Sequence, residues 1–176
     1  MKKNLPTYYV TSIFDVPISF FKKIGIKYLL TDLDNTIDAY DVFDPSPRVV
    51  KLKEDLEKEG IKLYIISNNT GDRVSQYATK LGVKFLNSTR KPFGFKLRKF
   101  IKENGLNKDE CILIGDQLVT DVPCGIRAGI KVMLTDPIVD RDQWTTRFNR
   151  KLDRPRRKRL IKKGIIAHMK EEDYGK

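Results

Sequence analysis

Histidine and cysteine are scarce in this chain of 176 residues. The sequence has one histidine, His168, near its end, and two cysteines, Cys111 and Cys124, without the spacing of a metal site. We therefore expect no histidine nucleophile, zinc site or Ser-His-Asp triad in the core. The cysteines should pack as small hydrophobic side chains in a reducing compartment. Chemistry in this chain has to come from carboxylates, lysine and hydroxyl groups.

Long apolar runs are also missing. No stretch reaches the roughly 18 residues that a membrane span requires. Lys2 and Lys3 are not followed by the apolar core of a signal peptide. At this length, with 40% hydrophobic residues and no internal repeat, the sequence predicts one globular domain with a sizeable core. We expect a cytoplasmic protein.

Positive charge is concentrated near the C-terminus. Residues 141–163 contain eleven Lys or Arg and two Asp, a net charge of +9 out of +12 for the whole chain. A run this dense predicts an anionic partner, such as lipid head groups, nucleic acid or an acidic protein surface. The alternative is a solvated helix face. Because this tail follows the last chemical motif, we expect it to lie outside the site and to control location rather than chemistry.

Apolar strand-like runs alternate with helical patterns through the middle of the chain. The sequence predicts strands at 27–32, 61–67, 83–86, 111–115 and 130–135, and helices at 46–58, 72–81, 94–103 and 119–128. This rhythm is typical of an α/β fold, a three-layer Rossmann-like parallel sheet of about five strands with helices on both faces. We divide the chain into an N-terminal arm packing on the core (1–25), a catalytic domain (26–138) and a basic helical extension (139–176).

Two carboxylates and a hydroxyl follow the first of these strands. Asp32, Asp34 and Thr36 come directly after an apolar run, and the carboxyl edge of a parallel sheet is where such folds bind ligands. One Asp can attack phosphorus, and the other can transfer the proton of the leaving group. A lone Asp-x-Asp is better explained as a helix cap, so the case depends on the other strand ends.

Polar groups also follow the next strands. They are Ser67-Asn68-Asn69-Thr70, Arg90-Lys91-Pro92, and Gly115-Asp116 with Asp121. Each alone could be a loop or a helix cap. Parallel strands bring these ends to one edge, so we expect several carboxylates, a hydroxyl and a lysine around one point. Clustered carboxylates repel one another unless a cation compensates them, and oxygen-only ligands fit Mg²⁺.

These motifs carry a family resemblance. Asp32-Leu-Asp-Asn-Thr36, Ser67, Lys91 and Gly115-Asp116 with Asp121 resemble, in order and spacing, the four motifs of haloacid dehalogenase (HAD) superfamily phosphatases over residues 26–135. Further segments resemble the YqeG-like group, which is similar to phosphatidylglycerophosphate phosphatases. They are the approach Ile13-Phe-Asp-Val16 with Gly25-Ile26-Lys27, then Arg90-Lys-Pro-Phe93, Gly115-Asp-Gln-Leu-Val-Thr-Asp121 and Thr146-Arg-Phe-Asn-Arg150. One departure is Pro123-Cys124, where the group tends to have small residues.

The resemblance implies a catalytic role for three residues. Asp32 attacks the phosphoryl group and forms an aspartyl-phosphate. Asp34 protonates the leaving alkoxide and then deprotonates the hydrolytic water, so its pKa should be raised. Lys91 supplies a cation to the transferring group.

The remaining residues are implied to bind metal or phosphate, or to support the site. Mg²⁺ would be held by Asp32, the backbone carbonyl of Asp34, and Asp116. Ser67 and the backbone N–H of Asn68 would hold phosphate oxygens. Two supporting roles complete the set: Asp121 orients Lys91 or a metal-bound water, and Thr36 fixes the turn that carries Asp34.

The spacing between motifs leaves no room for a cap domain. We expect an open site covered only by a flap at residues 37–44. Such a site suits a substrate whose bulk stays outside: a lipid, a nucleic-acid end or a protein phosphoresidue. The leading interpretation is phosphatidylglycerophosphate. The alternatives are a phosphatase of nucleic-acid ends or nucleotides, disfavoured because no aromatic base-stacking stretch accompanies the loops, and an adaptor that binds RNA or ribosomes through its tail.

The apolar N-terminal arm has two interpretations. Its aromatic and aliphatic residues, followed by Lys22 and Lys23, could rest at the inner face of a membrane beside the polybasic tail. For most of them we favour packing on the sheet edge as core. Phe20 and Phe21 are adjacent on one short predicted helix, so we expect at least one of them to be exposed.

Overall fold

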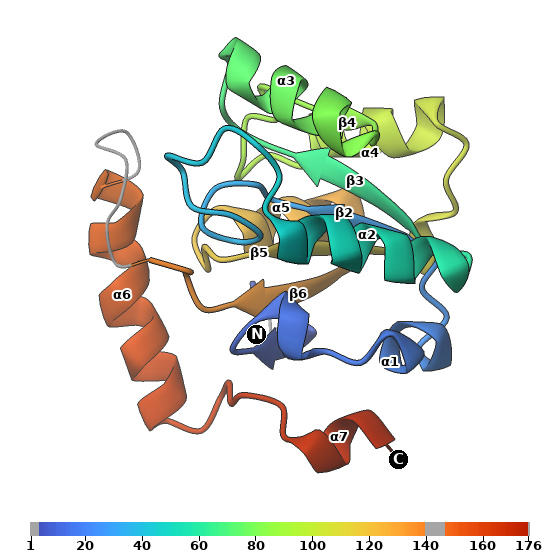
Figure 1. Cartoon of the computed structure of the whole chain (residues 1–176). Coiled ribbons are helices and arrows are strands. Elements are labelled where there is room, and N and C mark those ends of the chain that lie inside the picture. The colour runs from blue at the N-terminus through green and yellow to red at the C-terminus, as the bar shows by residue number, and fades with distance from the viewer. Residues whose placement is uncertain (1–3, 140–146, 176) are drawn as a thin grey trace.

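A parallel sheet organises the molecule. The computed structural model describes residues 4–139 and 147–175. Its sheet has six strands in the order β1-β6-β5-β2-β3-β4, all neighbours being parallel (Figure 1). The strands are β1 (Tyr8–Val10), β2 (Tyr28–Thr31), β3 (Lys62–Ile66), β4 (Phe85–Leu86), β5 (Cys111–Gly115) and β6 (Lys131–Thr135). The predicted α/β class is confirmed.

The sheet has one strand more than predicted. All five predicted strands are present, and β1 is added at the edge by the N-terminal arm. Tyr8 of β1 pairs with Met133 of β6, and Thr7 donates its backbone N–H to the carbonyl of Val132 at 2.8 Å. Three residues are too few for a periodic pattern to stand out from the sequence, and the partner lies more than 120 residues away.

Helices cover both faces of the sheet. Side chains alternate along each strand, so Leu29 packs with α1 (Ile18–Lys23), α2 (Pro47–Lys58) and α3 (Asp72–Leu81), whereas Leu30 packs with α4 (Phe95–Glu103) and α5 (Asp121–Ala128). The result is a helix–sheet–helix sandwich with a separate apolar cluster on each face (Figure 1). Short 3₁₀ turns at Ile13–Asp15 and Lys108–Glu110 complete the connections.

The arm is part of the core. Both Phe20 and Phe21 are buried, so the prediction that one is exposed is wrong. Helix α1 lies where the sheet edge meets the C-terminal segment: the Phe20 ring contacts Tyr8 and Tyr174, with ring centroids 5.3 and 5.4 Å apart. Tyr8 and Tyr174, which are far apart in the sequence, therefore help to bury the Phe20 ring. The sequence of the short helix alone does not indicate this burial.

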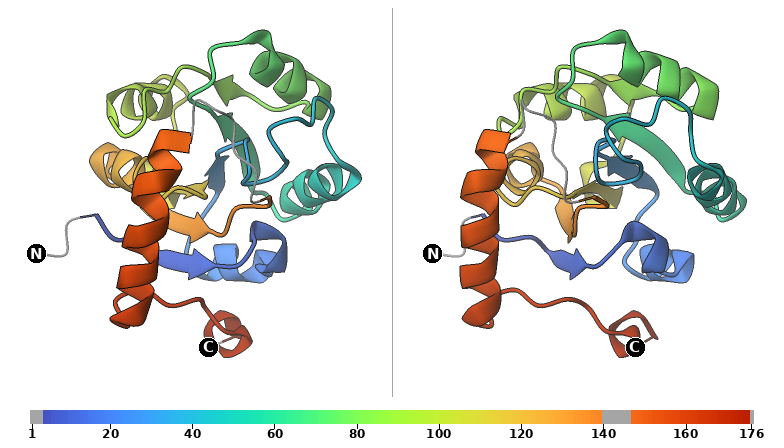
Figure 2. Two further views of the ribbon diagram at one scale, coloured as in Figure 1. Left: turned by 90° about the vertical axis from the view of Figure 1, so that its left-hand side faces the viewer. Right: turned by 60° about the vertical axis from the view of Figure 1, so that its left-hand side comes forward.

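Two helices follow the sheet. Helix α6 (Arg147–Lys162) stands across the sheet when the molecule is seen from the side (Figure 2), and α7 (Glu171–Gly175) ends the chain. Between them, the backbone N–H of Met169 donates to the carbonyl of Tyr9 at 2.7 Å, which covers the outer edge of β1. Among the described residues, no helix combines the length and apolarity needed to cross a membrane. The predicted start of the extension, near residue 140, lies outside the described residues.

The strand order sets the position of the site. The chain passes from β2 to β3 on one side, while β5 lies on the other side of β2. A crevice forms where connections leave in opposite directions, at the carboxyl ends of the strands. Asp32 follows β2, and Asp116 follows β5. In the described residues, one helix alone separates β2 from β3 and β3 from β4, so no cap domain is inserted there.

Candidate active site

Asp32, Lys91 and Asp121 form the buried centre of the site. Lys91 Nζ donates to Asp32 Oδ1 at 2.6 Å and lies 2.8 Å from Asp121 Oδ1. All three residues are almost fully buried. Three different strand ends supply them, as the parallel sheet predicts. The ion pair between Asp121 and Lys91 is the contact that the predicted orienting role of Asp121 requires.

Gly115 makes this close packing possible. A Cβ atom on Gly115 would lie 2.3 Å from Cγ of Asp121, which is closer than real atoms approach. The other oxygen of Asp121, Oδ2, accepts the backbone N–H of Gln117 at 3.0 Å. The glycine that ends β5 therefore lets the Asp121 side chain lie against the strand end and face Lys91.

Asp116 is the third buried carboxylate. Its Oδ1 accepts a hydrogen bond from the hydroxyl of Thr36 at 3.3 Å, and its Oδ2 accepts one from the guanidinium of Arg150 on α6. Carboxylate oxygens of Asp116, Asp32 and Asp121 all lie within 4.8 Å of one another. Such a compact set of oxygen ligands fits a hard divalent cation.

The electrostatics of the site favour a bound cation. Burial raises the pKa of Asp32 well above its usual range, against attraction from Lys91. Burial likewise raises the pKa of Asp116 to about 6, although Arg150 opposes this shift. Burial works against the charged form of Lys91, but Asp121 and Asp32 outweigh it, so the pKa of Lys91 is raised. A divalent ion would relieve the repulsion among these carboxylates.

Asp34 lies beside this cluster and contacts a different cation. The guanidinium of Arg73, in the first turn of α3, donates to Asp34 Oδ1. The same guanidinium donates to the carbonyls of Val42, at 2.8 and 3.0 Å, and Ala39, at 3.1 Å. Arg73 thereby ties the predicted flap to the residue expected to act as acid and base.

Ser67 and Asn68 lie at the end of β3. The Ser67 hydroxyl accepts the backbone N–H of Asn69 at 3.1 Å, an arrangement that stabilises the turn. The side chain of Asn68 pairs with the backbone of Lys91: Oδ1 accepts its N–H at 2.7 Å, and Nδ2 donates to its carbonyl at 3.3 Å. Asn68 therefore positions the lysine, a contact that sequence reasoning missed.

Helix α6 also reaches the site. Arg157 donates to the backbone carbonyl of Asp116, to the carbonyl of Thr135 at 3.0 Å and to Asp136 Oδ1 at 3.1 Å. Arg157 also bonds Asp153 Oδ2 at 3.2 Å through Nε, and Asp153 Oδ1 accepts from Val119 at 3.2 Å. The prediction that the basic tail lies outside the motif cluster is wrong, because its buried charges hold the loop that carries Asp116.

The contacts of α6 had a signal in the sequence. Arg150, Asp153 and Arg157 are spaced i, i+3 and i+7, which places them on one face of a helix. Asp153 is the one acid on this face, and it pairs with Arg157 four residues on. Of the trailing motif at 146–150, Thr146 lies outside the described residues.

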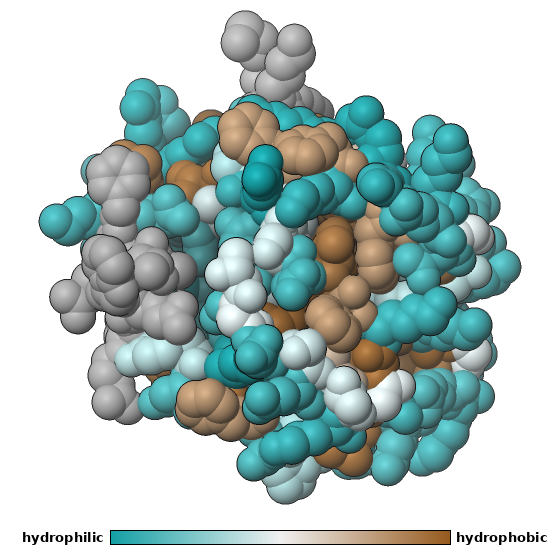
Figure 3. Space-filling model, turned by 90° about the horizontal axis from the view of Figure 1, so that it is seen from above, coloured by the Kyte–Doolittle hydropathy of each residue, from teal (hydrophilic) through white to brown (hydrophobic). Residues whose placement is uncertain are grey.

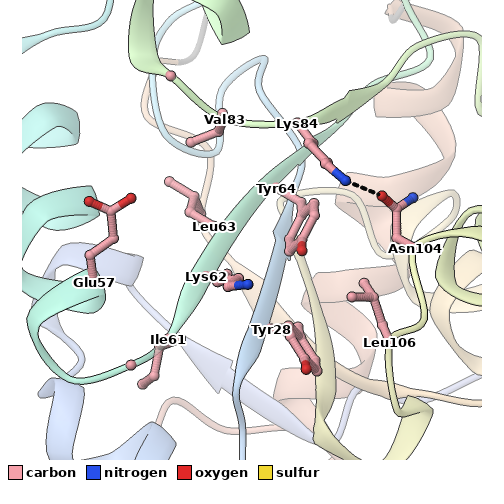
Figure 4. Close-up of a pocket in the computed structure, with 12 residues that line it drawn as sticks. Tyr28, Glu57, Ile61, Lys62, Leu63, Tyr64, Val83, Lys84, Asn104 and Leu106 are labelled. Atoms are coloured by element: carbon pink, nitrogen blue, oxygen red, sulfur yellow. Dashed lines mark hydrogen bonds between the residues drawn. The ribbon is translucent and has the colours of Figure 1, made fainter.

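A separate pocket lies at the opposite edge of the sheet. Tyr28 and Lys62, which begin β2 and β3, line it together with Tyr64, Lys84 and Asn104 (Figure 4). Lys84 Nζ donates to Asn104 Oδ1 at 3.0 Å there. None of the predicted site residues lines this pocket.

Comparison with known proteins agrees with this geometry. Residues 17–135 match the family model of haloacid dehalogenase-like hydrolases. The chain belongs to this family. It is 37% identical over 162 residues to the probable phosphatase YqeG of Bacillus subtilis, covering 92% of this chain and 94% of that protein. The chain is a phosphatase, and phosphatases of this family use a divalent metal ion.

Two more distant proteins are also similar. Phosphatidylglycerophosphate phosphatase 1 of Arabidopsis thaliana is 26% identical over 155 residues, which cover 82% of this chain but 44% of that protein. The cobalt-bound deoxy-D-mannose-octulosonate 8-phosphate phosphatase of Haemophilus influenzae shares the fold, with a TM-score of 0.51 and 16% identity, over 68% of this chain and 81% of that chain.

Proposed function

We propose that this phosphatase is Mg²⁺-dependent and converts phosphatidylglycerophosphate to phosphatidylglycerol through an aspartyl-phosphate on Asp32. The observation that carries the proposal is the buried cluster of Asp32, Lys91, Asp116 and Asp121 at a sheet edge without an inserted cap. A lipid can present its phosphate to such an edge while its acyl chains stay outside. Similarity to the Arabidopsis lipid phosphatase supports this substrate class.

In the first step, a carboxylate oxygen of Asp32 attacks phosphorus and the bond to the lipid oxygen breaks. The leaving oxygen takes its proton from Asp34. Arg73 holds Asp34 by Oδ1 and fixes that side chain beside the nucleophile. Lys91, already paired with Asp32, supplies a positive charge to the transferring phosphoryl oxygens.

In the second step, water attacks the phosphorus of the aspartyl-phosphate and gives its proton to Asp34. The bond between phosphorus and Asp32 breaks, which restores the carboxylate and releases phosphate. Ser67 and the backbone N–H of Asn68 would hold phosphate oxygens through both steps. When bound, the metal ion neutralises charge between the nucleophile and the phosphate.

Magnesium is the metal that the donor atoms favour. Side-chain oxygens of Asp32 and Asp116, with the backbone carbonyl of Asp34, would hold it, and the donor set contains no sulfur or imidazole group. Oxygen ligands with room for water and phosphate suit Mg²⁺.

Exposed cations on α6 support the proposal that the enzyme acts at a membrane surface. Arg156, Lys158 and Arg159 face solvent, and each basic residue near an anionic membrane contributes roughly 1 kcal/mol of attraction. We propose that the enzyme is cytoplasmic and associates peripherally with the inner membrane face.

Turnover of three substrates tests the proposal. Phosphatidylglycerophosphate in detergent micelles, a 3′-phosphorylated oligonucleotide and p-nitrophenyl phosphate are compared with Mg²⁺ present. We expect efficient hydrolysis of the lipid, slow hydrolysis of p-nitrophenyl phosphate and none of the oligonucleotide. Preferred hydrolysis of the oligonucleotide would replace the lipid with a nucleic-acid end, and no turnover of any substrate would favour an adaptor.

A further inference from the structure

A basic segment without acids follows β4. From residue 87 to residue 102 the sequence has six Lys or Arg and no Asp or Glu. Lys91, one of the six, is buried in the site. The segment therefore begins at the active site, and α4 carries it away from the carboxyl edge towards the pocket that Asn104 lines at the other edge, so its first residues lie nearest the catalytic centre.

Helix α4 separates apolar from basic residues. Its buried residues are Leu97, Phe100 and Ile101, which pack on the sheet. Its exposed residues Phe95, Arg98, Lys99 and Lys102 are spaced i, i+3, i+4 and i+7, which places them in one stripe. The only acid of α4, Glu103, lies at its end, 3.6 Å from Lys99. The stripe is a cationic face that starts with a phenylalanine.

Two phenylalanine rings stand out from this surface. Phe93 is 57% exposed and Phe95 is 52% exposed. Figure 3 shows the hydrophilic side chains that dominate the face seen from above, with apolar side chains in small groups among them. Rings beside cations are typical of segments that rest in the head-group region of a bilayer, where rings enter and cations bind phosphates.

We infer that the basic–aromatic surface, formed by Arg90, Phe93, Phe95, Arg98, Lys99 and Lys102, docks the enzyme on an anionic lipid bilayer. This inference rests on the proposed function, in which the substrate is a lipid. It adds which surface brings the active site to the bilayer. Rings inserted beside Lys91 bring the open carboxyl edge to the plane where lipid phosphates lie. Ile13, Phe20 and Phe21 of the arm are buried in the core and are not required for this contact.

Nucleic acid is the other polyanion that such a surface could attract. Exposed aromatics in single-strand binding proteins offer a free ring face to a base. Here the guanidinium of Arg127 lies over the Phe93 ring, 5.9 Å from its centroid, while also donating to the carbonyl of Pro92 at 2.9 Å. A cation fixed on one ring face disfavours base stacking and adds charge for lipid head groups.

Flotation with vesicles tests the surface. Full-length protein is mixed with phosphatidylglycerol-rich vesicles or pure phosphatidylcholine vesicles. We expect wild-type protein to float with the anionic vesicles only. Phe93→Ser with Phe95→Ser should weaken that binding about tenfold through lost ring insertion. Lys99→Gln with Lys102→Gln should weaken it by about tenfold or more and make the remaining binding less sensitive to salt.

Matched variants elsewhere control for composition. Val50 on α2 is 37% exposed, and α2 packs on the opposite face of the sheet from α4, so Val50→Ser should change binding less than about twofold. Lys23 and Lys51 are exposed and belong to α1 and α2, which pack on the opposite face of the sheet from α4, so Lys23→Gln with Lys51→Gln should have a similarly small effect. If the controls weaken binding as much as the surface variants, or the surface variants bind like wild type, the inference is wrong.

Two further outcomes separate this inference from the proposed function. Hydrolysis of micellar phosphatidylglycerophosphate without any effect of the surface variants on flotation would overturn the docking surface alone. The expected flotation pattern without hydrolysis of the micellar lipid would overturn the substrate alone. Binding of an RNA oligomer, lost in the Phe93→Ser/Phe95→Ser variant, without binding to vesicles would assign the surface to nucleic acid. Thermal unfolding checks that each variant is folded, and Phe95→Ser alone repeats the test with a single exposed change.

Discussion

The two faces of α6 carry the same kinds of residue and have opposite surroundings. On the inner face, Arg150 and Arg157 are buried and bind the side chain and backbone of Asp116. On the outer face, Arg156 and Lys158 are exposed. The charge of a segment therefore does not say whether it belongs to the surface or to a buried site; the position of each charge around the helix does.

The inner face makes the tail part of the candidate active site, because Arg150 and Arg157 bind Asp116. Three buried carboxylates, Asp32, Asp116 and Asp121, stand against Lys91 and Arg150 as their close cations. Arg150 thus compensates charge that a metal ion would also compensate. We expect that residues on the outer face of α6 can be replaced without changing the charge balance of the site.

Removing a buried cation from the inner face of α6 should cause the largest loss in the free energy of unfolding. Arg150→Gln leaves Asp116 buried without its cation, and removal of one partner of a buried ion pair costs about 3–5 kcal/mol. Urea unfolding of metal-free protein measures the loss, with Lys151→Gln on the exposed side of the same helix turn as control. Added Mg²⁺ should narrow the difference between Arg150→Gln and wild type. A loss no larger than that of the control would contradict a structural role for the inner face.

Metal affinity should depend on pH through the buried carboxylates. Metal binding needs them deprotonated, and the pKa of Asp116 is raised to about 6. Protons therefore compete below that pH, and affinity should rise as the pH increases. Between pH 5 and pH 7.5, titration calorimetry with Mg²⁺ should show affinity increasing about tenfold or more. A flat profile would mean that Asp116 does not ligate the ion. Activity should vanish with EDTA and return with Mg²⁺.

The outer face should have the smallest effect. Arg156→Gln, Lys158→Gln and Arg159→Gln together should change the free energy of unfolding by less than about 0.5 kcal/mol per site. They should leave hydrolysis of soluble p-nitrophenyl phosphate unchanged, because none of these side chains enters the site. Binding to anionic vesicles should fall. A large loss of p-nitrophenyl phosphate hydrolysis in this triple variant would contradict the claim that only the inner face of α6 supports the active site.

Much of the fold could be predicted from the sequence because its signals are local. Strand β5 and helix α3 have the predicted bounds, since a pure apolar run and a helix ending at Gly82 mark them clearly. The edge strand β1 could not be predicted, because its three residues become a strand only by pairing with β6. The burial of Phe20 likewise depends on Tyr174 at the far end of the chain.

The residues of the candidate site also fall into two groups, those that the sequence predicted and those that it did not. Asp32, Lys91, Asp116 and Asp121 were found because parallel strands bring their ends together, and the structure gathers them. Arg73 and Arg150 were not assigned to the site because they reach it from helices; for Arg150 the sequence offered one signal, its helical spacing with Asp153 and Arg157. The contact of Asn68 with the Lys91 backbone was missed since it depends on side-chain geometry that spacing does not specify. The roles assigned to these residues stay predictions.

The most direct test of the central claim is turnover of p-nitrophenyl phosphate by Asp32→Asn with saturating Mg²⁺. The substitution keeps the shape of the side chain but removes the attacking oxygen, so we expect activity to fall by at least about a thousandfold. Thermal unfolding should confirm that the variant is folded. Activity close to that of the wild type in folded Asp32→Asn would contradict a nucleophilic role for Asp32, and with it the proposed mechanism.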